Sequence, residues 1–375
     1  MSNYNSALPE NNKDAYQSFD TVDFVITFDN QSLQLGSLRL EGELEVTQDG
    51  TLLNSVANNA KNIRFDPYVG AHGCVESIQT SIQTEMGGEV LENLTEYPRL
   101  IKQYAASQKN VADMFNSSNV RELRSPAASL TTELMKPDEV VTQPTPALLT
   151  NPDFSLRLDC LLNTSNAPMP YDRTGPIRVS VNLARVNAFL HGPDVDGNTS
   201  YSLKDLRLVY KTVPGMDNRD PVTLRRRIGI KQSIQSSLAN IQVKVPSDRV
   251  EAFSSSFQVQ SQENTPRYNN TDLEKLPNMN SVTYLFNDQT NAAITFQLKS
   301  NVEVIKNFVE AMGDTGHNSV GIQNMVNNNG YGIGLRMSGG TIDLTNQKFS
   351  VQIDSEISNA RPLVFYMYFH TLLTV

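Results

Sequence analysis

Apolar and polar residues alternate along many short stretches of this chain. The clearest is residues 37–47 (SLRLEGELEVT), where Leu38, Leu40, Leu44 and Val46 share one parity and charged residues occupy most of the other. A period of two predicts a β-strand with one face in a protein core and the other in water.

The same alternation recurs as far as the C-terminus, with about seven candidate strands in each half of the chain. Many strands joined by polar loops form a sandwich or a barrel, and an eight-stranded jelly roll fits one half well. The candidate strands are residues 24–28, 37–47, 63–65, 74–84, 154–162, 177–183, 203–210, 241–245, 257–259, 282–286, 294–298, 333–337, 342–344, 349–353 and 363–373.

Helical spacing of apolar residues appears at two places. In residues 90–104 it predicts a helix that Pro98 kinks or divides, and in residues 302–312 it predicts one amphipathic helix. So few helices exclude alternating βα units. The predicted fold class is therefore all-β: a jelly-roll β-sandwich with a second β domain, large enough to be a second jelly roll, and few short helices.

The pattern also predicts how the chain is divided. Residues 1–20 are polar and predict a flexible N-terminal arm. Residues 21–213 predict a jelly-roll domain, residues 214–225 a linker, and residues 226–375 a second β domain of jelly-roll type. Residues 125–152 contain five prolines and predict a long loop or an extended crossing segment.

Composition narrows the function classes. The 375 residues carry a formal net charge of −9, which argues against a nucleic-acid binder as a whole. The two cysteines, Cys74 and Cys160, lie in apolar or alternating runs and are interpreted as buried thiols rather than a disulfide or a ligand pair. The N-terminus lacks the apolar region of a signal peptide, and no apolar run predicts a membrane span.

One basic run stands out from this acidic background. Arg225, Arg226 and Arg227 are consecutive, and Lys231 follows closely. Such a run can contact nucleic acid or an acidic neighbouring subunit, although no interleaved aromatic residue indicates base stacking. The alternatives are a solvated linker and a salt bridge between subunits.

Three other stretches resemble binding or catalytic motifs without completing them. Glu41, Glu43 and Glu45 lie side by side on one strand face, whereas a glycosidase needs two carboxylates across a cleft. Residues 194–198 (DVDGN) resemble the start of a calcium loop but lack its distal glutamate, which leaves a cation at Asp194 and Asp196 as an open alternative to a polar turn. The glycines of residues 330–334 precede a strand, so a flexible loop is favoured over a phosphate site.

The histidines provide no metal or catalytic constellation. His72, His191, His317 and His370 are scattered along the chain, and the spacings of zinc ligands and of the GxSxG nucleophile motif are missing. We therefore expect no catalytic residue, metal or cofactor and interpret the chain as a structural protein rather than an enzyme.

Several segments together resemble a known family. They resemble parts of the penton, or minor capsid, proteins of polinton-like viruses and virophages. The resemblance implies a jelly-roll subunit that forms homopentamers at the vertices of the icosahedral shell of a non-tailed double-stranded DNA virus, without catalysis. The segments are residues 70–78 (GAHGCVESI), 87–99 (GGEVLENLTEYPR), 38–46 (LRLEGELEV), 201–210 (YSLKDLRLVY), 276–277 and 286–288.

The size of residues 226–375 departs from a single jelly roll, so a second assignment stays open. This is a double jelly-roll major capsid protein, which assembles as pseudo-hexagonal trimers. Either assignment implies a location in the virion after assembly inside the host cell, with copies of itself and other capsid proteins as partners. The basic run would then be the candidate contact with the packaged genome.

A carbohydrate-binding β-sandwich for receptor attachment is the third hypothesis. It needs exposed aromatic side chains around a shallow site. Tyr201, Tyr268 and Tyr331 are its candidates.

Overall fold

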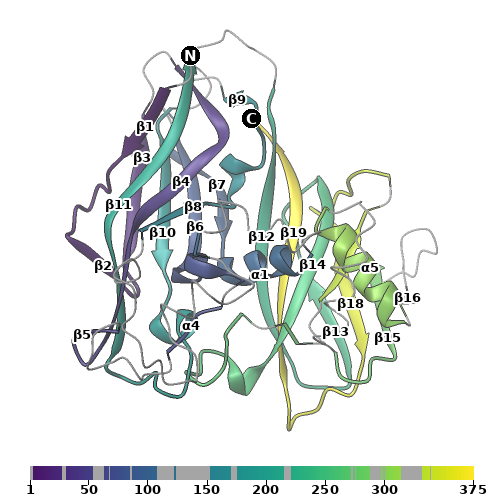
Figure 1. Cartoon of the computed structure of the whole chain (residues 1–375). Helices are drawn as coiled ribbons and strands as arrows, with labels where there is room; N and C mark the ends of the chain where they lie inside the picture. Colours follow the sequence, from purple (N-terminus) through teal and green to yellow (C-terminus); the bar gives the residue numbers. More distant parts are fainter. Residues whose placement is uncertain are drawn as a thin grey trace.

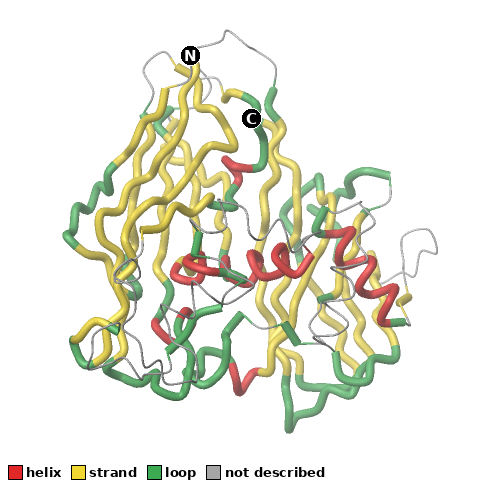
Figure 2. The backbone as a smooth tube through the Cα atoms, in the orientation of Figure 1, coloured by secondary structure: helices red, strands yellow, loops and turns green. Residues whose placement is uncertain are grey.

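The sequence folds into two β-sandwiches that lie side by side with a helix between them (Figure 1 and Figure 2). The structure is a computed structural model. It describes residues 3–27, 31–53, 63–66, 68–84, 87–107, 122–123, 153–169, 175–214, 221–271, 273–274, 276–287, 297–298, 300–313, 332–337 and 339–375.

The first sandwich contains a seven-stranded and a four-stranded sheet. The seven-stranded sheet consists of β1 (Asn3–Ala7), β2 (Ala15–Gln17), β4 (Gln31–Gln48), β5 (Thr51–Leu52), β8 (Asp153–Arg157), β9 (Pro168–Met169) and β11 (Thr199–Pro214). The four-stranded sheet consists of β3 (Thr21–Ile26), β6 (Val75–Thr84), β7 (Gly87–Leu94) and β10 (Ile177–Leu183).

The second sandwich contains two four-stranded sheets. One consists of β12 (Thr223–Ile234), β14 (Val250–Val259), β17 (Ile333–Arg336) and β19 (Leu363–Thr374). The other consists of β13 (Leu238–Val243), β15 (Ser281–Phe286), β16 (Gln297–Leu298) and β18 (Phe349–Asp354). The α-helices among the described residues are α1 (Tyr97–Ser107), α4 (Val186–Phe189) and α5 (Asn301–Ala311).

The two sandwiches share one strand order. In the second, the sheets read β12-β19-β14-β17 and β13-β18-β15-β16, which places the first strand beside the eighth and the second beside the seventh. The first sandwich gives the same order if β1 and β2 count as one interrupted strand and β8 and β9 as another. This is the antiparallel jelly-roll order, so the predicted fold class is confirmed and the second β domain is also a jelly roll. We call β1–β11 the first jelly roll and β12–β19 the second.

Alternation explains the core of each jelly roll. On β4, Leu40 and Leu44 face inward and are almost completely buried, as the period of two predicts. The second core centres on Phe253, whose ring centroid lies 5.2 Å from those of Phe349 and Phe369. Aromatic rings packed at these distances contribute large buried areas and favourable edge contacts.

Three local expectations were wrong. The flexible arm expected over residues 1–20 contains β1 and β2, which both pair with β11, because a polar segment can still complete the backbone hydrogen bonds of a sheet edge. The expected linker ends early, since β12 begins at Thr223. The helix expected over residues 90–104 forms only from Tyr97, because residues 90–94 belong to β7. Pro98 lies in the first turn of α1, where proline needs no hydrogen-bond partner, and therefore begins a helix instead of kinking one.

The helix expected over residues 302–312 is confirmed as α5. Ser300 caps it by accepting a hydrogen bond from the N–H of Glu303 at 3.2 Å. The proline-rich residues 125–152 lie outside the described residues.

We predict that Phe253→Ala lowers the free energy of unfolding by about 3–5 kcal/mol, because it leaves a cavity among four aromatic rings. Chemical denaturation measures the change. Val302→Ala, at a side chain that is 67% exposed on α5, is the control and should stay within about 0.5 kcal/mol. Equal losses in both variants would contradict this packing.

Candidate functional site

The helix α1 lies between the two jelly rolls, beside the sheet β12-β19-β14-β17 (Figure 1). Its contacts with the outer face of this sheet form a polar junction. Gln103 of α1 donates to Ser256 Oγ at 3.0 Å and accepts from Ser254 Oγ at 3.0 Å. Ser254 also lies 3.0 Å from Nε2 of His370. All four side chains are buried, so this sheet has an apolar inner face and a polar face that is also removed from water.

Arg99 fixes the N-terminal end of α1 to the second jelly roll. Its Nη2 donates to Asn270 Oδ1 at 3.1 Å and also to Gln258 Oε1. Its guanidinium carbon lies 3.7 Å from the centroid of the Tyr366 ring. A buried arginine that stacks on an aromatic ring and also donates hydrogen bonds holds one orientation of the helix.

Arg227 makes the central charged contact of the junction. It projects from β12, and its Nη2 donates to Asp159 Oδ1 at 2.9 Å and to Tyr104 OH at 3.0 Å. Its backbone N–H donates to Oε1 of Glu92 at 2.9 Å, and the N–H of Leu161 donates to Oε2 at 2.6 Å. The edge strand β12 is therefore bound by side chains of the first jelly roll. This binding is a way to protect an exposed edge.

Burial dominates the electrostatics around Arg227. It raises the pKa of Glu92 to about 7 even though the charge of Arg227 favours the ionised carboxylate. It also raises the pKa of Tyr104 to about 12. Burial opposes the charge on Arg227 itself, but Asp159, Tyr104 and Glu92 outweigh it and hold the pKa of Arg227 above its ordinary value.

A second charged cluster joins the two jelly rolls through Asp66. Its Oδ2 accepts from Lys102 Nζ at 2.5 Å and from Asn269 Nδ2 and Thr271 Oγ1 at 2.7 Å each. Its Oδ1 accepts from the N–H of Tyr68 at 2.8 Å. Burial alone would raise the pKa of Asp66, but Lys102 and the hydrogen bonds outweigh it and lower the pKa to about 2.

The structure separates the four residues of the predicted basic site. Arg225 is half exposed and pairs with Glu251 at 3.2 Å, while Arg226 donates to Thr371 Oγ1 at 3.3 Å. Arg227 is buried in the junction, and Lys231 pairs with glutamates within the chain. Alternation turns Arg226 to the opposite face of β12 from the other three, and Arg227 is buried, so the four do not form one basic patch. Contact of Arg225 and Arg226 with nucleic acid or a neighbour stays a prediction.

The junction residues on the first jelly roll were not singled out from the sequence. Asp66, Glu92 and Asp159 stand alone among unlike neighbours, and no spacing connects them. The one usable signal was Arg99 and Gln103, which lie four residues apart and so share a face of α1.

The incomplete motifs have structural roles. Asp196 Oδ1 accepts from Gln48 Nε2 at 2.9 Å and from the N–H of Asn198 at 2.8 Å, which makes residues 194–198 a closed polar turn. Within the described ranges, no group of three His, Cys, Asp or Glu side chains could hold a metal ion. Gly334 allows α5 to approach β17, since a Cβ there would lie 2.8 Å from Ala311 Cβ.

Two further expectations concerned cysteines and tyrosines. Cys74 and Cys160 are buried free thiols, as predicted, and burial raises the pKa of each to about 12. Tyr201 was a candidate for an exposed aromatic side chain but is buried on β11, where its hydroxyl donates to the carbonyl of Ala184. Tyr268 is 44% exposed, and Tyr331 lies outside the described residues.

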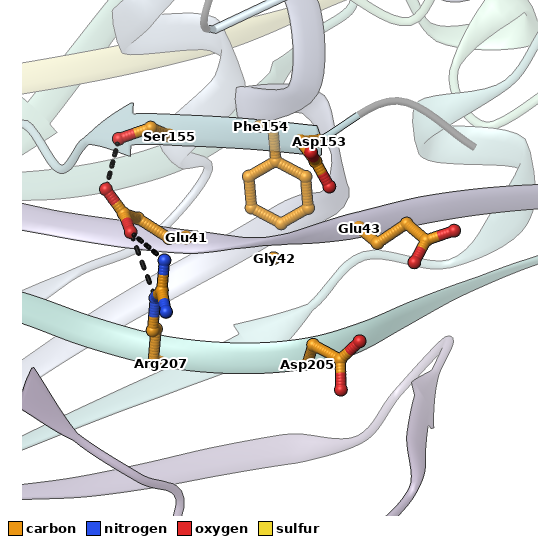
Figure 3. Close-up of a pocket in the computed structure, with 8 residues that line it drawn as sticks. All are labelled: Glu41, Gly42, Glu43, Asp153, Phe154, Ser155, Asp205 and Arg207. Carbon is orange, nitrogen blue, oxygen red and sulfur yellow. Dashed lines mark hydrogen bonds and ion pairs between the residues drawn. The ribbon is translucent and has the colours of Figure 1, made fainter. Parts of the chain in front are cut away.

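One pocket of about 360 Å³ lies on the seven-stranded sheet (Figure 3). Oε2 of Glu41 pairs with Arg207 Nη2 at 2.9 Å, and Oε1 accepts from Ser155 Oγ at 2.9 Å. The lining carboxylates come from three strands of one sheet, β4 with its two neighbours β8 and β11. The lining residues are Glu41, Gly42, Glu43, Asp153, Phe154, Ser155, Asp205 and Arg207.

Comparison with known proteins gives a match at the level of the fold. No protein-family model and no curated protein matches the sequence. The Faustovirus major capsid protein superposes with a TM-score of 0.62 at 8% identity, covering 100% of this chain and 90% of that one. PBCV-1 VP54, fitted into a reconstruction of the virophage Sputnik, gives 0.57 at 10% identity over 100% and 95%. The mavirus major capsid protein gives 0.50 at 9% identity over 99% and 90%.

No helix among the described residues is long and apolar enough to cross a membrane.

We predict that Arg227→Ala lowers the free energy of unfolding by about 3–5 kcal/mol, because it leaves the buried Glu92 and the partly buried Asp159 without their cation. Arg225→Ala, two positions away on the same strand, is the matched control. It removes an exposed ion pair and should cost no more than about 1 kcal/mol. Urea titration of both variants measures the difference, and equal costs would rule out the buried pair.

We also predict that Asp66 makes the fold sensitive to acid. Asp66 titrates near 2 when folded and near 3.8 when unfolded, so the unfolded chain takes up the proton first as the pH falls. Asp66 contributes about 2 kcal/mol to the free energy of unfolding. This contribution is fully present above about pH 4 and is lost as the pH falls toward 2.

Unfolding free energies measured from pH 6 down to pH 2 test this prediction. Asp66→Asn should lower stability at pH 6 and flatten the decline below about pH 4. Thr271→Val, which removes one of the donors to Asp66, should flatten it less. A parent and an Asp66→Asn variant with the same slope would contradict the role of this carboxylate.

Proposed function

We propose that this chain is a structural capsid subunit of a non-tailed icosahedral double-stranded DNA virus, of the double jelly-roll major capsid type. The observation that carries this proposal is the repetition of one jelly-roll strand order in both halves of the chain. The full-length superposition on the Faustovirus and PBCV-1 capsid proteins supports it. The protein is then located in the virion and acts by assembly, with no catalytic step.

The geometry suits a capsomer of three copies. Three chains with two jelly rolls each place six similar units around one axis, which gives a pseudo-hexagonal ring. Such a ring needs a constant angle between the two jelly rolls of each chain. The buried contacts of Arg99, Asp66 and Arg227 supply that constraint.

A homopentamer at the shell vertex is the other form of the same proposal. It was the first expectation from the resemblance of the sequence, and it stays a prediction. The second jelly roll favours the trimer. Three copies place six jelly rolls around one axis, whereas five copies would place ten, which does not give a pseudo-hexagonal ring. Other capsid proteins are partners in either form, and Arg225 and Arg226 are the candidate contacts with the genome.

We predict that the purified chain forms particles with the mass of three copies. Light scattering coupled to size-exclusion chromatography measures the mass, and electron microscopy of the same fraction should give a six-lobed outline with threefold symmetry. A fivefold ring would instead select the vertex role. A chain that remains monomeric at every concentration would contradict both capsid roles.

A further inference from the structure

Each jelly-roll sheet ends in edge strands whose free N–H and C=O groups can bind another strand. The edge of β12 is occupied by the first jelly roll, where Arg225 N–H donates to Thr164 Oγ1 at 2.9 Å and Arg227 N–H donates to Glu92. The edge of β3 is covered by the segment before it, since Glu10 N–H donates to the carbonyl of Asp23 at 2.8 Å. These two edges are therefore closed within the chain.

Most of the other described edges are too short or carry charged residues. The strands β2, β5, β9 and β16 have two or three residues each. The strand β7 contains Glu89 and Glu92, β8 contains Asp153 and Arg157, and β17 contains Arg336. Charged residues and short length both oppose pairing with another chain.

The strand β13 differs from all of these. Its six residues, Leu238–Val243, include no charge and no proline, and its register with β18 is continuous from one end to the other. Leu238 is 71% exposed. Among the described residues, only Ser236 of the adjoining turn and the partner strand β18 are hydrogen-bonded to it. This edge is therefore open and lacks the usual protection against pairing.

The topologically equivalent strand of the first jelly roll shows why β13 is open. Residues 8–14 precede β3 and reach back over its edge, where Glu10 and Asn11 bond to it. The link before β13 is only residues 235–237, which is too short to do the same. A strand from another molecule could occupy the place that residues 8–14 occupy in the first jelly roll.

The strand β1 is the one other described edge of five residues or more with these properties. Asn3–Ala7 contains no charge and no proline, pairs with β11 in continuous register, and leaves Tyr4 70% exposed. It lies at the margin of the first jelly roll, whereas β13 lies in the second (Figure 1). Within the part of the chain that the structure describes, each copy therefore carries two open edges of similar length on different jelly rolls.

We propose that β1 of one copy pairs with β13 of the next copy in the ring, so that the seven-stranded sheet of one chain continues into a sheet of its neighbour. The inference rests on the proposed function. A closed ring of three or five copies requires a head-to-tail contact between two different surfaces, and β1 and β13 are two such surfaces. Backbone hydrogen bonds supply the affinity in strand addition.

Cysteine cross-linking tests the pairing directly. The double variant Ser6→Cys with Leu238→Cys places one thiol beside each edge, at positions that are exposed in the chain. The native Cys74 and Cys160 are buried, so a short bis-maleimide should react with the introduced thiols. For the double variant we expect cross-linked species of increasing size, up to the number of copies in the ring. For each single variant we expect only chains that are not cross-linked.

Four outcomes would overturn the pairing. A dimer from Leu238→Cys alone would mean that β13 pairs with itself, and a dimer from Ser6→Cys alone would mean the same for β1. If light scattering shows that the double variant forms a ring but the reagent does not cross-link it, the pairing of β1 with β13 is contradicted and the proposed function is not. A strictly monomeric parent chain would remove both.

A charge substitution gives a second measurement with a matched control. Leu238→Lys adds a charge at the open edge, and Val302→Lys adds the same charge at an equally exposed aliphatic side chain on α5. Leu238→Lys should raise the concentration needed for assembly about tenfold or more, while Val302→Lys leaves it unchanged. Thermal unfolding of the monomers should be the same in both. Equal assembly of the two variants would contradict the role of β13.

Discussion

The burial of polar side chains between the two jelly rolls is the constraint on which the rest of the structure depends. The sheet β12-β19-β14-β17 turns Ser254, Gln258 and Tyr366 toward α1, where they are removed from water. Hydrogen bonds are directional, so these groups are satisfied at one orientation of the helix. Apolar burial has no such direction and would tolerate sliding. The junction therefore joins the jelly rolls and also sets the angle between them.

The charged groups of the junction respond to pH in opposite directions. Burial raises the pKa of Glu92 to about 7 from 4.5, so this carboxylate costs stability as the pH rises through that range and the unfolded chain ionises first. Burial lowers the pKa of His370 to about 3, and its cost grows as the pH falls below 6.5, where the unfolded chain binds the proton first. Asp66 acts in the same sense as His370 at lower pH. Acid therefore destabilises the junction through His370 and Asp66 and stabilises it through Glu92.

Alternation along the sequence was sufficient to predict an all-β jelly-roll fold, because a strand with one buried face records that face in its period, as Leu40 and Leu44 do on β4. The strand β1 shows no such alternation in its sequence, because its residues are mostly polar and it forms by pairing with β11. The strand β14 is buried on both faces, and Ser254 and Ser256 face α1, so their polarity did not indicate exposure. The junction joins residues far apart in sequence, and only the folded chain brings them together.

Two jelly rolls held at a constant angle are what a shell subunit requires, because an angle that varied would prevent the same contacts from closing around a ring. The coupling between them is most directly measured by calorimetric unfolding of the dissociated chain at neutral pH. A rigid polar junction predicts one transition, with calorimetric and van't Hoff enthalpies equal. Two separate transitions, one for each jelly roll, would contradict it.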